Sequence, residues 1–125
     1  VLEHVDDPFA AMREIRRILR PGGHLLLAVP HIWPYHPCPE DYWRFTQQGV
    51  LELCTRSGIA ARRLVSTGGG IAAVAQLFNI IVFGAVGRCG APLFVFTNAL
   101  GYFLDRVART DLLCMNFACL AQKET

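Results

Sequence analysis

Histidines, one carboxylate and one cysteine are the side chains of this sequence whose types and spacing could do chemistry. His4 follows Glu3 near the start of the chain, and His31, His36 and Cys38 follow one another in a loop rich in proline and aromatic residues. Histidine exchanges protons near pH 7 and is a common metal ligand. The His-x4-His-x-Cys spacing, however, lacks the paired pattern and the fourth nearby ligand of zinc sites. We therefore predict no metal ion at this loop.

The end of the same loop, Asp41 to Arg44, combines an ion pair with two aromatic residues. An aspartate and an arginine at this spacing can fasten a loop to the helix that follows it. Tyr42 and Trp43 each supply apolar bulk with one polar atom. These residue types favour a structural role for the segment over a direct role at a ligand site.

Length, composition and charge define a small globular protein. The chain has 125 residues, of which 53% are apolar, so it can build one core. A formal net charge of only +2 argues against a dedicated nucleic-acid binder. Five cysteines without a CxxC pair are typical of reduced, mostly buried thiols in a cytoplasmic protein. The start of the chain resembles neither a signal nor a transit peptide, and Val1 lies in mid-pattern, so we expect further sequence upstream.

The elements that position these residues alternate between helix and strand. Asp7-Pro8 begins a helix that Pro21-Gly22-Gly23 ends, and its arginines are predicted to be a solvated face in preference to an anion site. Leu25 to Val29 is predicted to be a strand buried on both faces of a parallel sheet. A second helix from Thr46 to Ser57 and two further strands are predicted after it; these strands are residues 59–66 and 112–121, with a polar tail at 122–125.

This alternation predicts an open α/β sheet. In such sheets ligands bind beyond the carboxyl ends of the strands, so the loop after Pro30 is the first place to look for a site. The loop contains both His31 and His36. The sequence therefore predicts a ligand site at this end of the sheet.

Two nearly uncharged runs, 71–86 and 91–104, form a predicted helical hairpin. They count sixteen and fourteen residues, whereas a membrane-spanning helix needs about 20 apolar residues. We therefore do not expect either run to span a membrane. Packing within the protein is favoured for them, and peripheral contact of 71–104 with a membrane surface or a partner is the alternative.

Two blocks of sequence resemble the C-terminal half of a class I S-adenosylmethionine-dependent methyltransferase of the type-11 domain family. The first block is VLEHV with Asp7-Pro8, EIRRILRPGG at 14–23 and the strand ending at Pro30; the second is His36-Pro37, EDYWRFT at 40–46, Gly49 and Ser57-Gly58. Together they cover about half of the chain.

The resemblance implies a Rossmann-like sheet with an inserted helical hairpin. Residues 25–29 would be the fifth of seven strands, and the last two strands would form an antiparallel pair. The implied parts are 1–69 (methyltransferase domain), 70–110 (hairpin) and 111–125 (last strand). The first three strands and the glycine-rich cofactor loop would lie outside this chain, which alone should bind the cofactor weakly or not at all.

The resemblance also assigns candidate roles at the site. Glu3 and His4 would face the methionine end of S-adenosylmethionine, with His4 as the base and Glu3 as its orienter or, as in some similar enzymes, a metal ligand; a purely structural turn is the alternative. His31, His36, Asp41 and Tyr42 would border the acceptor, with one of the two histidines lining its pocket and the other packed in the loop.

The resemblance thus implies part of an enzyme, a cytoplasmic methyltransferase, with association to a membrane as an alternative. Its acceptor would be a small molecule, with lipid-linked and saccharide compounds as candidates. The alternative is a non-catalytic, methyltransferase-like module that uses the apolar hairpin to contact a membrane or a protein. The sequence specifies neither the methylated atom nor the oligomeric state.

Overall fold

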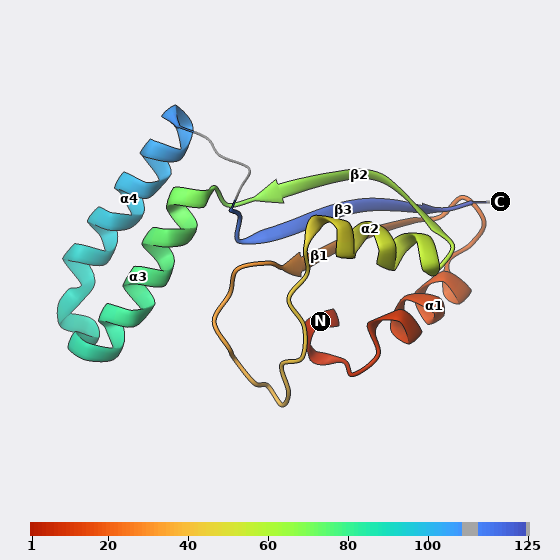
Figure 1. Ribbon diagram of the computed structural model, residues 1–125, viewed down its shortest axis with the longest axis horizontal. Helices are drawn as coiled ribbons and strands as arrows, with labels where there is room; N and C mark the ends of the chain where they lie inside the picture. Colours follow the sequence, from red (N-terminus) through yellow and green to blue (C-terminus); the bar gives the residue numbers. More distant parts are fainter. Residues whose placement is uncertain (109–112, 125) are drawn as a thin grey trace. The chain divides into compact units, whose positions relative to one another are not determined.

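A computed structural model describes residues 1–108 and 113–124 (Figure 1). The chain divides into two compact units. The first comprises Val1–His31, Tyr35–Val65 and Asn116–Thr125, and the second comprises Ile32–Pro34 and Ser66–Met115. The boundary predicted between positions 110 and 111 lies outside the described residues.

Helix α1, Pro8–Ile18, begins where the sequence predicts. The Asp7 carboxylate accepts a hydrogen bond of 2.9 Å from the Ala10 amide, and Pro8 occupies the first turn, where its missing donor has no cost. Met12 is fully buried on the inner face. Ile18, which the helical spacing places on that face, is 71% exposed instead, because it is the last residue of the helix.

Three strands form the sheet of the first unit, β1 (His24–Pro30), β2 (Ile59–Thr67) and β3 (Asn116–Lys123), in the order β1-β3-β2. Strand β1 pairs antiparallel with β3 (Figure 1). The prediction that β1 is buried on both faces of a parallel sheet is wrong for this chain. Strand β1 has β3 as its one strand neighbour and so lies at the edge of the described sheet, and Leu26 on one of its faces is 77% exposed. The fold is α/β with a small antiparallel sheet.

Strand β3 is shifted toward the C-terminus from its predicted position. Its predicted start at Leu112 lies outside the described residues, and the strand begins at Asn116. Gln122, predicted to be part of a polar tail, pairs with His24, and the Lys123 amide donates to the Gly23 carbonyl oxygen at 2.9 Å. Pairing with β1 thus overrides the polar composition of this segment.

Helix α2, Gln47–Arg56, is capped by the Thr46 hydroxyl, which accepts from the Gly49 amide at 3.0 Å. Gly58 ends the turn after it with a positive φ of 68°, as its position predicts. The inner face of α2 carries Leu53 and Cys54, both buried. Full burial of such apolar side chains stabilises a fold by about 1.5–3 kcal/mol each.

The five cysteines are present as thiols, and three of them, Cys54, Cys114 and Cys119, are buried. Burial, together with the neighbouring Cys119, raises the pKa of the Cys54 thiol to about 12. Cys38 and Cys89 are exposed. Most of the thiols are therefore buried, as the sequence predicts.

The second unit contains the predicted helical pair, α3 (Gly70–Val86) and α4 (Ala91–Val107), joined by the 3-10 turn η2 (Gly87–Gly90). The two helices pack against each other along their length (Figure 1). We call Gly70–Val107 the α3–α4 hairpin. Its base is tied by Asp105, whose two carboxylate oxygens each accept at 2.9 Å, from the amides of Ile71 and Ala72.

Candidate functional site

The first part of the candidate site is the single 3-10 turn η1, Leu2–His4. Leu2 is buried and anchors the turn. The backbone carbonyl of Glu3 accepts two hydrogen bonds, from the Tyr42 amide at 2.7 Å and from the Trp43 amide at 3.2 Å. The loop after β1 therefore folds back onto η1, although the two segments are far apart in the sequence.

His4 is held by this returning loop. Its Nδ1 atom donates to the Glu40 carbonyl oxygen at 2.5 Å, because a carbonyl can only accept. That bond leaves Nε2 without a proton in the neutral ring. Nε2 lies 3.5 Å from the Glu3 Oε1 atom, so a proton taken up by Nε2 would face a carboxylate. The hydrogen bond that orients the His4 ring thus comes from Glu40, and Glu3 lies beside the other ring nitrogen.

His36 is the second imidazole of the site. Its ring meets the ring of His4 edge to face, with centroids 5.1 Å apart and an interplanar angle of 85°. The His36 amide donates to Asp41 Oδ2 at 2.9 Å, and the ring Nδ1 lies 3.4 Å from the same oxygen. The carboxylate of Asp41 therefore positions both the backbone and the ring of His36.

Asp41 and Arg44 form the clamp that the sequence suggests. Two hydrogen bonds of 2.6 Å join the guanidinium to the two carboxylate oxygens, and the Asp41 side chain is only 1% exposed. The Arg44 hydrogen bonds hold the pKa of Asp41 well below its usual range, against the effect of desolvation. The same hydrogen bonds raise the pKa of Arg44. The observed contacts of this pair are structural.

His31 does not join His4 and His36. Its Nδ1 donates to the Phe45 carbonyl oxygen at 2.8 Å, and its ring packs against Phe117 with centroids 5.2 Å apart. The structure thus brings one of the two loop histidines to η1 and packs the other beside the sheet. The substrate-binding roles of His31, His36, Asp41 and Tyr42 stay predictions.

Glu3, His4 and His36 also form a group that could hold a metal ion. One ligand atom from each lies within 4.8 Å of the others, and the rings and carboxylate match the donors that divalent transition metals accept. The sequence spacing suggests only the combination of His31, His36 and Cys38, and not this one. The missing signal is the fold-back of the loop onto η1, which no local spacing reveals.

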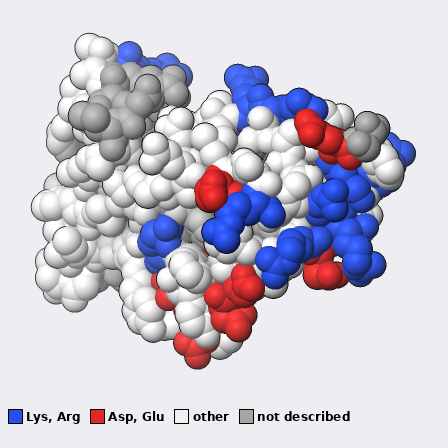
Figure 2. Space-filling view, turned by 45° about the vertical axis from the view of Figure 1, so that its right-hand side comes forward, with Lys and Arg blue, Asp and Glu red and all other residues white. Residues whose placement is uncertain are grey.

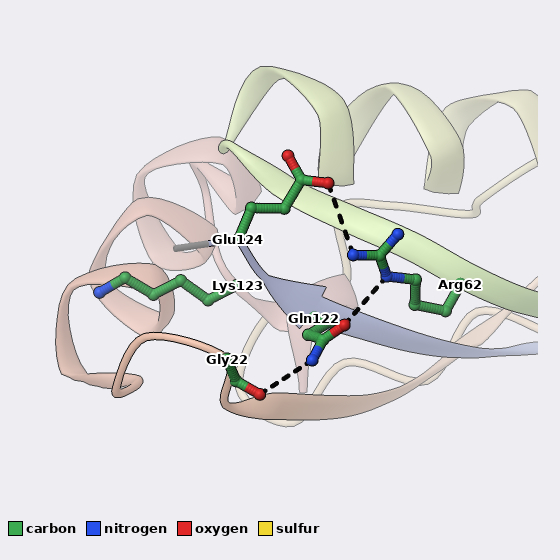
Figure 3. Close-up of a pocket in the computed structure, with 5 residues that line it drawn as sticks. All are labelled: Gly22, Arg62, Gln122, Lys123 and Glu124. Atoms are coloured by element: carbon green, nitrogen blue, oxygen red, sulfur yellow. Dashed lines mark hydrogen bonds and ion pairs between the residues drawn. The ribbon is translucent and has the colours of Figure 1, made fainter.

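A polar hollow of about 350 Å³ lies at the other end of the sheet, where β1 begins (Figure 3). Arg62 Nε donates to Gln122 Oε1 and Gln122 Nε2 donates to the Gly22 carbonyl oxygen, both at 3.1 Å. Arg62 also lies 3.5 Å from Glu124. These groups satisfy one another, so the Glu3-His4-His36 group is the stronger candidate for chemistry.

Comparison with known proteins finds a family whose model matches the start of the chain. The family model described as "Methyltransferase domain" matches residues 1–27, the segment that contains Glu3 and His4. The predicted resemblance to a class I S-adenosylmethionine-dependent methyltransferase domain is confirmed by this match.

Two individual proteins are similar over larger parts. The "Uncharacterized 37.1 kDa protein in transposon TN4556" of Streptomyces fradiae is 38% identical over 68 residues, which are 51% of this chain and 19% of that protein. The crystal structure of the [4+2]-cyclase SpnF superposes with a TM-score of 0.54 at 17% identity, over all of this chain and 47% of that one. This chain therefore spans about a fifth of the first and about half of the second. Together the matches support a methyltransferase-like fold.

Proposed function

We propose that this chain is part of an S-adenosylmethionine-dependent methyltransferase in which Glu3, His4 and His36 form the proton-transfer site. One observation carries the proposal. The segment that matches the methyltransferase domain contains Glu3 and His4, and the loop bearing His36 folds back onto it, with ring centroids of the two histidines 5.1 Å apart. In its finer form the proposal includes a Rossmann-like sheet into which the α3–α4 hairpin is inserted.

The residues present suit one end of the cofactor. S-adenosylmethionine is cationic at its sulfonium and at its ammonium group, and the Glu3 carboxylate, whose side chain is 13% exposed, is an anionic partner for that end. When bound, the cofactor supplies an electrophilic methyl group. Glu3 and His4 would hold its methionine end, and the rest of the cradle would come from outside this chain.

The chemistry left to the chain is positioning and proton transfer. His4 Nε2 accepts the proton of an acceptor hydroxyl or amine. His4 Nδ1 donates its proton to the Glu40 carbonyl oxygen at 2.5 Å, and this hydrogen bond fixes the orientation of the ring. Glu3, 3.5 Å from Nε2, stabilises the resulting imidazolium. His36 and the half-exposed Tyr42 border the acceptor.

The acceptor in this proposal is a small molecule, with lipid-linked and saccharide compounds as candidates. A cytoplasmic location, with association to a membrane, belongs to the same proposal. The five cysteine thiols support the reducing compartment.

The test uses the full-length protein that contains this chain. Calorimetry should show binding of S-adenosylmethionine, and a labelled methyl group should pass to a component of a small-molecule extract. His4→Gln should keep cofactor binding and slow transfer by about 10²–10⁴-fold, the usual contribution of a general base. His24→Gln is the matched control, because His24 is exposed at the start of β1 and has no part in the proposed site. Equal turnover of wild type and His4→Gln would eliminate the base role.

A second candidate function has one observation in its favour. The α3–α4 hairpin leaves large apolar side chains exposed, among them Ile81 and Val95, and a shared fold does not by itself determine a reaction. The chain would then be a non-catalytic methyltransferase-like module that presents the α3–α4 hairpin to a membrane or a protein. Failure of the full-length protein to bind S-adenosylmethionine would favour this reading.

A further inference from the structure

Polar side chains of the α3–α4 hairpin form hydrogen bonds between its two helices. Asn79 is 6% exposed and lies between the helices, where its Nδ2 donates to Asn98 Oδ1 at 2.8 Å. The Thr97 hydroxyl donates to Asn79 Oδ1 at 2.6 Å. The amide of Asn79 is therefore used in contacts between the two helices.

Small residues bring the same two helices close together. A Cβ atom built on Gly101 would lie 3.1 Å from the Ala75 Cβ atom and 3.3 Å from the Ala72 Cα atom. Close approach at small residues together with interhelical hydrogen bonds is the way helices associate in lipid, where apolar burial gives no driving force.

Large apolar side chains cover the outside of the hairpin. Ile81 is 76% exposed and Val95 is 70% exposed. On each helix the exposed apolar residues include stripes on different faces: Val74 and Ile81 against Phe83 on α3, and Leu100 and Phe103 against Val95 on α4. Because the stripes face different directions, one flat protein surface or a second copy would cover only part of them.

Charge is confined to the two ends of the hairpin. Gly70–Val107 has a mean hydropathy of 1.9 in its most apolar window, only 17% of which is buried, and by length and composition it could cross a membrane. Its Asp, Glu, Lys and Arg residues are Arg88 in the turn and Asp105 and Arg106 at the base. In Figure 2 the coloured charged side chains gather over the other unit, and the visible face of the hairpin is mainly uncharged.

The length of the helices limits how far they reach. The chain reverses at η2, so each helix has 17 residues. At 1.5 Å per residue, such a helix is about 25 Å long, a little less than the hydrocarbon thickness of about 30 Å. A hairpin of this size enters and leaves a bilayer on the same side, and the long side chain of Arg88 can extend from its tip toward the far headgroups.

We propose that the α3–α4 hairpin inserts tip first into a lipid bilayer, with Asp105 and Arg106 at the level of the headgroups. An apolar groove of about 240 Å³ between the helices, whose lining includes Phe78, Leu100 and Gly101, accommodates an acyl chain. The insertion gives the membrane association proposed above a specific surface, and it does not depend on methyl transfer.

The test is flotation of the full-length protein with phosphatidylcholine vesicles. Wild-type protein should float with the vesicles, and trypsin cleavage after the exposed Arg88 should slow on their addition. The double variant Ile81→Glu/Val95→Glu should lose at least about tenfold in vesicle partitioning, because charged side chains are strongly excluded from the bilayer centre. Ile81→Leu/Val95→Ile, at the same positions, should float like wild type.

Circular dichroism of both variants establishes that each is folded. Wild-type protein that stays at the bottom of the gradient would overturn the proposal, as would a dimer in light scattering that vesicles do not dissociate. Binding of S-adenosylmethionine should be equal in both variants. A failure of membrane insertion is thereby distinguished from a failure of the methyltransferase proposal.

Discussion

The first unit and the α3–α4 hairpin distribute their apolar and polar side chains in opposite ways. In the first unit Met12 and Leu53 are buried, and the charged side chains lie on the outside or pair with one another. In the hairpin the buried polar residue is Asn79, and the large apolar side chains point outward. Both arrangements satisfy polar groups, yet only the first removes its apolar surface from water. The hairpin therefore needs a medium or partner to complete it, whereas the first unit carries its own core.

The largest expected contrast comes from truncating one aliphatic side chain in each region. Leu53→Ala should cost about 2–5 kcal/mol of the free energy of unfolding, because it leaves a cavity beneath α2. Ile81→Ala, at a side chain 76% exposed, should change it by less than about 0.5 kcal/mol in the absence of lipid. Urea unfolding of the two variants measures both values. Equal losses would contradict the difference between the regions.

A smaller effect is expected from the polar contact inside the hairpin. Asn79→Ala removes the hydrogen bonds to Asn98 and Thr97 and should cost about 0.5–1.5 kcal/mol for each. Gln76→Ala, one turn away and with no part in this contact, is the control. Thermal unfolding followed by the helical circular dichroism signal measures both. If the two variants melt alike, Asn79 is not what fastens the helices.

The clamp in the first unit should respond to acid. The pKa of Asp41 is lowered in the folded protein, chiefly by Arg44, from its ordinary value of 3.8. A depressed carboxyl pKa contributes stability that is complete above the unfolded value, at about pH 4 and higher, and is lost as pH falls toward the folded value. Asp41→Asn should lower stability at pH 6 and bring the two acid-unfolding curves together at low pH. Parallel curves across the whole range would refute the clamp.

The smallest effect concerns reactivity rather than stability. Burial raises the pKa of Cys54 to about 12, so at pH 8 this thiol is almost wholly protonated. Cys38 and Cys89 are exposed and should react first with iodoacetamide, with Cys54 modified only after unfolding. Peptide mapping by mass spectrometry at timed intervals measures the order. Early labelling of Cys54 would show that α2 opens readily.

Signals that act over a few residues predict their parts of the fold well. Asp7-Pro8 begins α1, Thr46 caps α2 and Gly58 ends the following turn, because each satisfies or releases backbone groups within its own neighbourhood. The two helices of the hairpin are likewise confirmed. The pairing partner of β1 and the extent of β3 are predicted poorly, since both depend on which strand lies alongside.

The candidate site, too, is predicted where local signals act and missed where distant segments meet. His4 and Glu3 are identified from the resemblance, and the Asp41–Arg44 pair from its spacing. The hydrogen bond between His4 and Glu40 joins positions 36 residues apart, so no local pattern reveals it. Nor does a local pattern decide that His36, rather than His31, meets His4.

Hydrogen bonds at the base of the α3–α4 hairpin hold the two ends of this segment together. The Met115 amide donates to the Thr67 carbonyl oxygen at 3.2 Å, and Asp105 caps the start of α3, so the chain returns to the point from which it left. The entropic cost of closing a loop rises only slowly with the length of the loop. We therefore expect the register of β1 and β3 to survive replacement of the residues between Thr67 and Met115 by a short turn or by a different hairpin.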